Sequence, residues 1–330
     1  MSRYKVFKLH FLTPLHIGLG RSTYDFSSSE LHSDTITAAL ASIKAQQGAS
    51  SEEIADMLRK VVVSSAFPYV GDMLFLPKPL FVDQINIEGK DVAEYRKAVK
   101  SVQYIESSVW TGLLSGQPVH ITESQLKDKY IIPKGRNEFI NPIRKQVACR
   151  ASVSRSGEDN TEPFYFEWLY FDSSCDCGLY FIADAESTVM QEIESLLVTL
   201  GETGIGTDRT VGGGQFEVKC SEINFPDADS NSTGWLSLSL YLPSLSEQKS
   251  FDLSKSCYNL ICRGGYMSGS TNENLRHLWK KSIYMYQEGS VFYTEECPVG
   301  NIVDLRPNWN GQEMHPVYRS GKALFIPVMQ

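Results

Sequence analysis

Six glycines lie within the nineteen residues from Leu200 to Val218, although the whole chain of 330 residues contains only 24. Glycine has no Cβ and readily adopts positive φ, so such a segment lets another group approach the backbone closely or lets consecutive N–H groups surround an anion. Arg209 within the segment favours an anion, and we expect that anion to be a phosphate backbone. The alternative is a flexible loop without a ligand.

The residues on either side predict a helix before the glycines and a strand after them. Apolar residues recur at helical spacing from Val189 to Leu200, Thr188 and Gln191 form a capping-box pattern, and a strand is expected from Phe216. In a P-loop or dinucleotide site the order is the reverse, because a strand leads into the glycines and a helix receives the phosphate. A nucleotide-triphosphate or Rossmann site is therefore disfavoured.

Composition restricts where a nucleic acid could bind. The chain has 31 basic and 39 acidic residues and a formal net charge of −8, so any such site must be a local patch. Its length and its 42% hydrophobic content allow a large core, usually in two domains. No apolar run approaches the roughly 18 residues that span a bilayer, and the N-terminus lacks a signal-peptide pattern. We expect a soluble, cytoplasmic protein with no membrane partner.

The seven cysteines predict neither a disulfide framework nor a zinc site. Their number is odd, and they include no CxxC pair and no histidine at ligand spacing. We expect reduced and mostly buried thiols, with Cys175 and Cys177 as the one pair of interest. Paired carboxylates and GGDD-type metal motifs are not evident either, so we expect no metal and no cofactor.

Helical and alternating patterns mix along the chain without a regular βαβ order, which favours an α+β fold. Strands are expected at residues 4–12, 164–170, 177–183, 236–242, 283–286 and 323–328. Helices are expected after a cap at Ser33 or Asp34, from about Ser51, and over residues 92–114. The segment 130–160 has no clear period, and the polar residues 225–234 predict a linker.

Three regions outside the glycine segment could carry chemistry. The first is the loop Leu15–Arg21 with the helix start at 32–34, where a helix N-terminus beside glycines suits a phosphate, and where His16 and His32 could act as acid and base. The second is the segment 134–155, which has six basic residues and one acidic residue and predicts a basic finger that grips phosphates, or else a solvated loop. The third comprises weak glycine-bearing segments at 263–268, 288–292 and 315–327.

These segments together resemble the RAMP superfamily of CRISPR proteins. The resemblance rests on the glycine segment, the LHIG opening with HSD, the SSAFPYVGDMLFLPKP turn, and the late GSVF and HPVYRSGKAL segments. The combination of SDTITAAL, FPYVGD, PKP and GSVF looks most like the Csm-type subunit that caps the crRNA 5′ end in type III-A interference complexes. It extends over nearly the whole chain.

The resemblance implies two ferredoxin-like, RRM-related lobes at residues 1–224 and 235–330, joined by the linker at 225–234, with a basic β-hairpin thumb inserted at about 130–162. It implies a non-catalytic protein of antiviral defence that holds the repeat-derived 5′ handle of the crRNA. The expected protein partners are the large polymerase/cyclase-domain subunit and the adjacent backbone subunit. The thumb would reach over the guide–target duplex, which brings target RNA close.

The residues expected to contact RNA lie in the first loop, the first helix start, the basic segment, the glycine segment and the C-terminal half. They are His16, Ile17, Gly18, Gly20, Arg21, Ser33, Asp34, Arg144, Lys145, Arg150, Arg155, Gly204, Gly206, Arg209, Gly212, Gly213, Gly214 and Arg263. Many members of the family are more basic in the glycine loop, so backbone N–H groups are expected to supply part of the contact here. The alternative function is a metal-independent crRNA-processing endoribonuclease that uses His16 or His32. A nucleotide-binding domain is disfavoured by the missing phosphate motifs.

Overall fold

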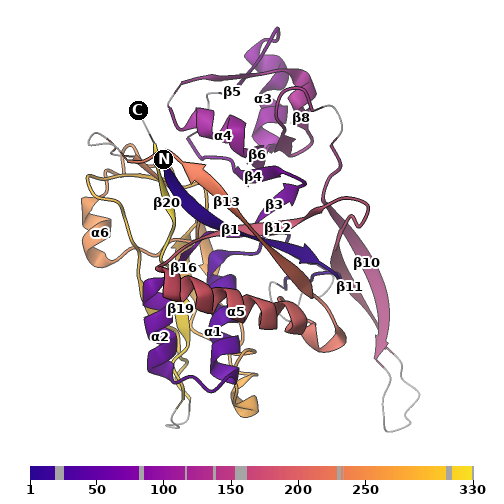
Figure 1. Cartoon of the computed structure of the whole chain (residues 1–330), viewed down its shortest axis with the longest axis vertical. Helices are drawn as coiled ribbons and strands as arrows, with labels where there is room; N and C mark the ends of the chain where they lie inside the picture. The colour runs from indigo at the N-terminus through magenta and orange to yellow at the C-terminus, as the bar shows by residue number, and fades with distance from the viewer. Residues whose placement is uncertain are drawn as a thin grey trace.

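The computed structural model describes residues 1–18, 26–81, 85–115, 117–136, 139–152, 162–228, 232, 234–309 and 314–328. It confirms an α+β architecture, with helices packed on a large mixed sheet and smaller sheets beside it (Figure 1). No membrane-crossing helix occurs in these ranges, because none combines the required length with enough apolar residues.

The large sheet has β1 and its two long neighbours at its centre. Its order is β13-β1-β12-β3-β4-β6-β9-β8, with β2 also paired to β12. All of these pairs are antiparallel except β6 with β9. The strands are β1 (Ser2–Phe11), β2 (Val62–Val63), β3 (Phe67–Val70), β4 (Met73–Pro77), β6 (Tyr104–Glu106), β8 (Leu126–Lys127), β9 (Tyr130–Ile131), β12 (Cys177–Asp184) and β13 (Phe216–Phe225).

Both faces of this sheet are covered, because alternate side chains of β1 point to opposite sides. Phe7 and Leu9 pack with the apolar stripes of the helices α1 (Ser33–Gln46), α2 (Ser51–Lys60) and α5 (Ser187–Thr203). Val6 enters a second core, which includes residues such as Trp110 and Leu236. That second core therefore continues across the predicted linker, and the division of the chain into two domains stays a prediction.

The helix stripes agree with the predicted spacing, but the caps predicted for α1 and α5 are wrong. Ser50 caps α2 in a full capping box with Glu53. The N-cap of α1 is His32 and that of α5 is Glu186, and neither side chain makes a capping hydrogen bond. The side chains of Ser33 and its neighbour at 34 are instead engaged with distant parts of the protein.

The helix predicted over 92–114 is two helices separated by a strand. The structure has α3 (Val92–Ser101), then β6, then α4 (Ser107–Leu113). Tyr104 and Ile105 are buried in the sheet, where pairing with β4 and β9 outweighs the local helical pattern. The Glu106 carboxylate accepts the N–H of Ser108 and so starts α4. The short parallel pair β5 (Ile85–Ile87) and β7 (Val119–Ile121) and the 3-10 helix η1 (Glu123–Gln125) complete this part.

An antiparallel hairpin of β10 (Ile143–Ser152) and β11 (Glu162–Phe171) projects from the body (Figure 1). Its ten residue pairs run from Ile143 opposite Phe171 to Ser152 opposite Glu162. The strand predicted from the aromatic alternation at 164–170 is confirmed within β11. The partner strand lies in the segment that has no clear period. It lacks alternation because Ile143 is its one buried hydrophobic residue among those whose burial is described.

The C-terminal part is mostly short strands. The strand predicted over 236–242 ends early, because the Ser237 hydroxyl accepts the N–H of Ser239 and donates to its carbonyl, which forms a tight turn. The elements are β14 (Gly234–Ser237), β15 (Leu260–Arg263), β16 (Ile283–Tyr286), β17 (Val291–Tyr293), β18 (Ile302–Asp304), β19 (Tyr318–Ser320), β20 (Phe325–Val328), α6 (Leu245–Ser250) and the 3-10 helix η3 (Glu273–Leu275).

The cysteines are free thiols, as predicted, but they are not mostly buried. Cys177 is buried, Cys175 and Cys257 are partly exposed, and the other four are exposed. Burial, with the neighbouring Cys175 thiol, raises the pKa of Cys177 to about 12. Within the described ranges, no group of three His, Cys, Asp or Glu side chains is arranged to hold a metal ion.

Candidate RNA-binding site

The glycine segment forms a folded loop between α5 and β13, held against the first loop of the chain. The Leu12 N–H donates to the Gln215 carbonyl (2.8 Å), and the Gly214 N–H donates to the Pro14 carbonyl (2.8 Å). Farther along, the Thr207 N–H donates to the His16 carbonyl (2.9 Å). The structure therefore brings together the two glycine-bearing loops, which are about 190 residues apart in sequence.

Most of the glycines make room for the protein's own backbone. A Cβ at Gly206 would lie 2.4 Å from the His16 carbonyl oxygen, and one at Gly204 would lie 2.4 Å from the Gly213 oxygen. At Gly214 the same atom would lie 2.0 Å from the Ile205 oxygen. These contacts are far too short for a side chain, so close packing within the loop accounts for these glycines. Gly18, on the first loop, likewise faces Thr207.

The tip of the glycine loop is the part that remains open to a ligand. Gly212 has φ +84° and no atom within 4 Å of a Cβ position. Asp208 adopts the left-handed conformation with φ 62°, directly before the 3-10 helix η2 (Arg209–Val211). The N–H groups of residues 208–210 have no acceptor among the described residues. Where the backbone changes from a left-handed to a right-handed conformation, successive N–H groups can point into one concave site that binds an anion.

Arg209 is half-buried at this tip and has no carboxylate partner within the described ranges. Burial, and next the nearby Arg276 guanidinium, lower the pKa of Arg209. Two guanidinium groups near each other repel, and Arg209, which has no acidic partner among the described residues, favours an external anion. Arg276 belongs to the C-terminal part, where it donates to the Ser270 carbonyl (2.9 Å) and to Glu273 (3.2 Å).

The base of the hairpin forms the side of the site next to the glycine loop. Leu15 and Leu169 exchange backbone hydrogen bonds of 2.9 and 2.8 Å, so the first loop pairs with the outer edge of β11. The His16 Nδ1–H donates to the Glu167 carbonyl (2.7 Å). Ring atoms of Trp168 would lie 2.9 Å from a Cβ at Gly213. The hairpin, the first loop and the glycine loop are thus one packed unit.

The basic residues of β10 lie at different positions around this unit. The Lys145 ammonium donates to the Ser27 carbonyl (2.6 Å) and to Glu167 (3.0 Å), so the protein itself neutralises it. Arg144 is exposed and donates to Asp172 (3.0 Å). The Arg150 guanidinium lies over the rings of Phe166 and Trp168, with carbon-to-centroid distances of 5.2 and 5.1 Å.

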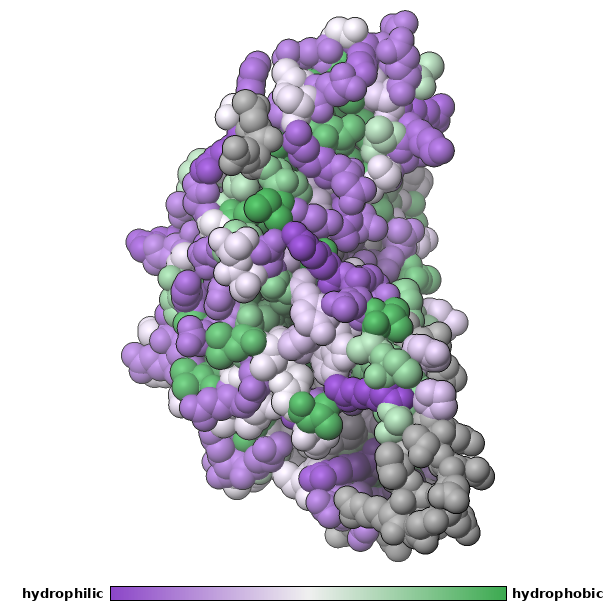
Figure 2. All heavy atoms as spheres, turned by 90° about the vertical axis from the view of Figure 1, so that its right-hand side faces the viewer, coloured by the Kyte–Doolittle hydropathy of each residue, from purple (hydrophilic) through white to green (hydrophobic). Residues whose placement is uncertain are grey.

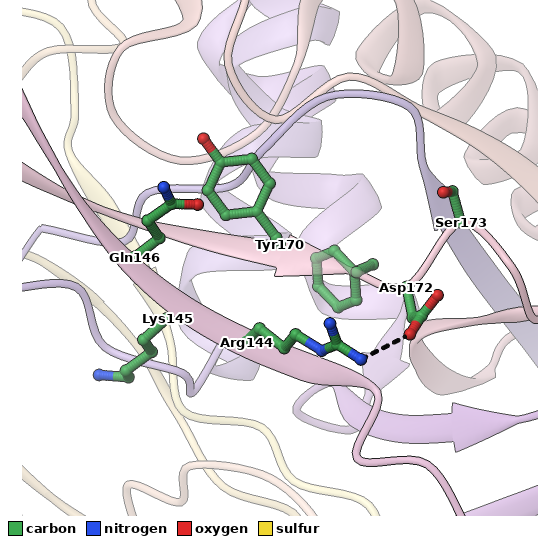
Figure 3. Close-up of a pocket in the computed structure, with 7 residues that line it drawn as sticks. Arg144, Lys145, Gln146, Tyr170, Asp172 and Ser173 are labelled. Atoms are coloured by element: carbon green, nitrogen blue, oxygen red, sulfur yellow. Dashed lines mark hydrogen bonds and ion pairs between the residues drawn. The ribbon is translucent and has the colours of Figure 1, made fainter.

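An open hollow of about 420 Å³ lies at the hairpin base, between β10 and the turn that follows β11. Figure 3 shows the Arg144–Asp172 ion pair across it, with Tyr170 and Gln146 on the other side and Lys145 directed away. On the hairpin surface, Val147 and Tyr165 are 52% and 56% exposed. Figure 2 shows hydrophilic and hydrophobic side chains in small patches over this side of the molecule, without one continuous apolar area.

The structure places Ser33, Asp34 and Arg263 in a buried polar network, and their predicted contacts with RNA stay predictions. Asp34 is completely buried and accepts hydrogen bonds from Arg263 (2.9 and 3.0 Å) and from Arg319. The Ser33 hydroxyl accepts the Leu240 N–H (3.0 Å). The start of α1 therefore joins the N-terminal part to the C-terminal part and leaves no room for a phosphate.

Neither predicted catalytic histidine can reach a substrate in this structure. His16 is 1% exposed and His32 is 5% exposed. The His32 Nδ1 lies 2.8 Å from a Glu288 carboxylate oxygen, and that carboxylate also accepts from Ser65. Burial alone would lower the pKa of His32, but the Glu288 carboxylate raises it above its ordinary value. The alternative function as a histidine-dependent endoribonuclease loses its geometric basis.

Of the remaining predicted residues, Ile17 lies in the first loop, where its N–H donates to the Ser27 hydroxyl (3.0 Å). Gly20, Arg21 and Arg155 lie outside the described residues. Their predicted contacts with RNA stay predictions.

Known proteins that are similar to this chain are Csm4 proteins of CRISPR systems. Residues 230–328 match the family model of the CRISPR Csm4 C-terminal domain. CRISPR system Cms protein Csm4 of Streptococcus thermophilus is 26% identical over 97% of this chain and 98% of its own length. The protein of the same name from Thermococcus onnurineus is 27% identical over 78% of this chain and 83% of its own length.

The fold agrees with solved structures over the whole chain. A Csm4 chain from a Csm3-Csm4 subcomplex in the type III-A CRISPR-Cas interference complex has a TM-score of 0.61 at 16% identity, with 100% of both chains covered. A chain from a Csm1-Csm4 cassette in complex with cA4 has a TM-score of 0.60 at 20% identity, with 99% and 98% covered. The chain is thus similar to Csm4 proteins along nearly its whole length, and its C-terminal part matches the Csm4 family model. The predicted RAMP resemblance is confirmed.

Sequence reasoning missed several residues that shape the site of this Csm4-type protein. The aromatic alternation predicts only a strand, but Trp168 packs against Gly213 of the glycine loop and Phe166 against His16 of the first loop. Their signal was present in the aromatic alternation beside a basic strand, which is a common pattern in RNA-binding surfaces. Arg319 gives no local signal, because its partner Asp34 lies 285 residues away in sequence.

Proposed function

We propose that this Csm4-type chain is a non-catalytic crRNA-binding subunit of a type III-A CRISPR effector complex. It holds the repeat-derived 5′ handle of the crRNA through the glycine-loop tip and the hairpin base. The match of the C-terminal part to the Csm4 family model and the whole-length similarity to Csm4 proteins support this assignment. We further propose that the architecture consists of two ferredoxin-like lobes and that the β10–β11 hairpin is the inserted thumb.

One observation carries the proposal. Arg209 is a half-buried cation without an acidic partner among the described residues, and it stands beside the unpaired N–H groups of residues 208–210. A half-buried cation without a counter-charge costs desolvation energy. The chain has more acidic than basic residues, yet none of those described neutralises Arg209. A phosphodiester oxygen satisfies both the guanidinium and the N–H groups, whatever the base attached to it. This arrangement suits an RNA backbone.

The proposal assigns no catalysis to the chain. Its first-loop histidine donates to a backbone carbonyl under a cover of aromatic rings, and His32 is paired to Glu288 inside the protein. A general acid or base must reach the proton that it transfers within about 3 Å. Buried imidazoles at these two positions support a scaffold role.

The proposed protein partners are a Csm1 large subunit and a Csm3 backbone subunit. Solved structures contain a Csm1-Csm4 cassette and a Csm3-Csm4 subcomplex, and this chain matches the Csm4 fold over its full length. The projecting hairpin exposes Val147 and Tyr165, which suits contact with a neighbouring molecule. Target RNA comes near the hairpin in the assembled complex, in this proposal.

The test is the RNA that copurifies with the complex. Coexpression of the tagged chain with the other complex subunits and a CRISPR array is expected to yield RNAs with one uniform 5′ sequence and variable remainders. Arg209→Gln should reduce the bound RNA, whereas Arg59→Gln, on the exposed face of α2, should not. RNA of random 5′ sequence would overturn handle binding. Specific cleavage of repeat RNA by the purified chain in EDTA would overturn the non-catalytic role.

A further inference from the structure

Arg150 is the outermost residue of a cluster of tilted rings at the base of the hairpin. His16, buried beneath, lies 4.8 Å from the Phe166 ring centroid and 6.1 Å from that of Trp168. The two aromatic rings lie 5.7 Å from each other and are 3% and 5% exposed. The Arg150 guanidinium lies over both of them and is itself partly exposed. The cluster therefore runs from the buried His16 to the surface, where the Arg150 guanidinium covers it.

Within the part of the chain that the structure describes, no residue uses the polar edge of this guanidinium. Among the described residues no carboxylate, hydroxyl or carbonyl accepts from the Arg150 side chain, in contrast to Arg144, which is paired with Asp172. A guanidinium has five N–H donors in one plane, and stacking on a ring leaves all of them free at the edge. The position is therefore held by the two rings beneath it, while its donors and its outer face remain open.

The neighbourhood of Arg150 connects this cluster to the glycine-loop tip. Gly213 touches the Trp168 ring from the loop side. Asp208, at the tip, is close enough to Arg150 and His16 for both to lower the pKa of its carboxyl group, against the larger effect of burial, which raises it. A ligand whose backbone lies along residues 208–210 would bring its next group over the cluster.

We propose that the outer face of the Arg150 guanidinium is a stacking platform for one unpaired nucleobase of the bound RNA. The proposal rests on the proposed function, since it names the group of the RNA that this part of the site receives. Single-stranded bases commonly stack on aromatic rings or on arginine planes, and the edge donors are then placed to bond with the base or its sugar–phosphate. The sequence pattern alone had suggested a phosphate grip for this residue.

Shape and charge are separated by two substitutions at this one position. Arg150→Lys keeps the positive charge and removes the plane, whereas Arg150→Tyr keeps a plane and removes the charge. A phosphate contact requires the charge, and a stacking platform requires the plane. We therefore expect Arg150→Lys to weaken binding of a repeat-derived 5′-handle RNA by about 5- to 150-fold, the range of one lost base stack. Arg150→Tyr should bind within a few-fold of wild type.

Arg59→Lys is the matched control, because Arg59 on α2 is exposed, pairs with Glu52 and has no ring beneath it within the described ranges. Its affinity should stay near that of wild type. The assay is titration of the purified full-length chain into handle RNA at several salt concentrations. A second set of RNAs carries 2-aminopurine at single handle positions. One position should be quenched by wild type and by Arg150→Tyr, but not by Arg150→Lys.

The outcomes are distinct. Full binding by Arg150→Lys together with a loss in Arg150→Tyr, and a salt slope lowered by about 0.7, would identify a phosphate contact and overturn the stacking platform. Equal binding by all variants would also overturn it, because Arg150 would then not touch the RNA. If the wild-type chain and its complex bind no handle RNA, the proposed function itself fails. Circular dichroism and thermal melting of each variant distinguish lost contacts from lost folding.

Discussion

Asp34→Asn is the substitution for which the structure predicts the largest loss of stability at constant side-chain volume. The carboxylate has 0% side-chain exposure, while its partners Arg263 and Arg319 have 18% and 6%. An asparagine fits the same space, so no cavity forms, but two buried guanidinium groups lose their counter-charge. Breaking a buried ion pair from one side costs about 3–5 kcal/mol. Because the network joins α1 to β15 and β19, the expected effect is a lower free energy of unfolding of the whole protein.

The control is Asp72→Asn. Asp72 accepts two hydrogen bonds from Arg136, of 3.0 and 2.8 Å, but its side chain is 74% exposed. A surface pair of this kind is worth about 0–1 kcal/mol, because water and salt screen it. Urea unfolding of both variants, followed by tryptophan fluorescence and far-ultraviolet circular dichroism, compares the two losses directly. A loss at Asp34 no greater than that at Asp72 would refute the reasoning.

The pH dependence gives an independent check. Burial would raise the pKa of Asp34, but Arg319 and Arg263 outweigh it and hold the pKa well below its usual range. A depressed folded-state pKa contributes stability above the unfolded-state value, and this contribution is lost only as the pH falls through the folded-state value. The difference between wild type and Asp34→Asn should therefore stay constant from pH 8 to pH 5 and shrink in stronger acid.

Three further outcomes are expected. Gly214→Ala should destabilise the chain strongly, because its Cβ meets a carbonyl oxygen at 2.0 Å, whereas Gly212→Ala should cost only the ~1–2 kcal/mol of a left-handed residue; thermal melting ranks the two. Arg209→Gln should weaken the binding of handle RNA of any sequence. It should also lower the slope of log affinity against log salt concentration by about 0.7, as measured by titration at several salt concentrations. An unchanged slope would contradict a phosphate contact. The Glu288 carboxylate raises the pKa of His32. The stability that the protonated His32 contributes is therefore complete below the unfolded-state pKa and is lost as the pH rises through the folded-state value. His32→Gln should remove this loss from the urea midpoints measured between pH 6 and pH 9.

The sequence predicted what depends on local spacing. The stripe from Val189 to Leu200 and the alternation in β1 were sufficient because each shows its period within one element. The glycine enrichment indicated a close approach to backbone, but the approaching group, the His16 carbonyl, lies about 190 residues away. Asp34 seemed a helix cap by position, and only the fold reveals Arg319, which is 285 residues distant. Long-range partners of single polar residues leave no periodic trace.

The pairing of Leu15 with Leu169 has a mechanical consequence. One short segment of chain is bonded on one side to the projecting hairpin and on the other to the glycine loop, through the carbonyls of Pro14 and His16. If a neighbouring molecule displaces the hairpin, the segment from Pro14 to His16 is pulled with it, because Leu15 is hydrogen-bonded to Leu169. Such a displacement either moves the first loop and the glycine loop together or strains the hydrogen bonds between them. We therefore expect a force on the hairpin to reach the glycine loop, and with it the proposed RNA site, through these hydrogen bonds.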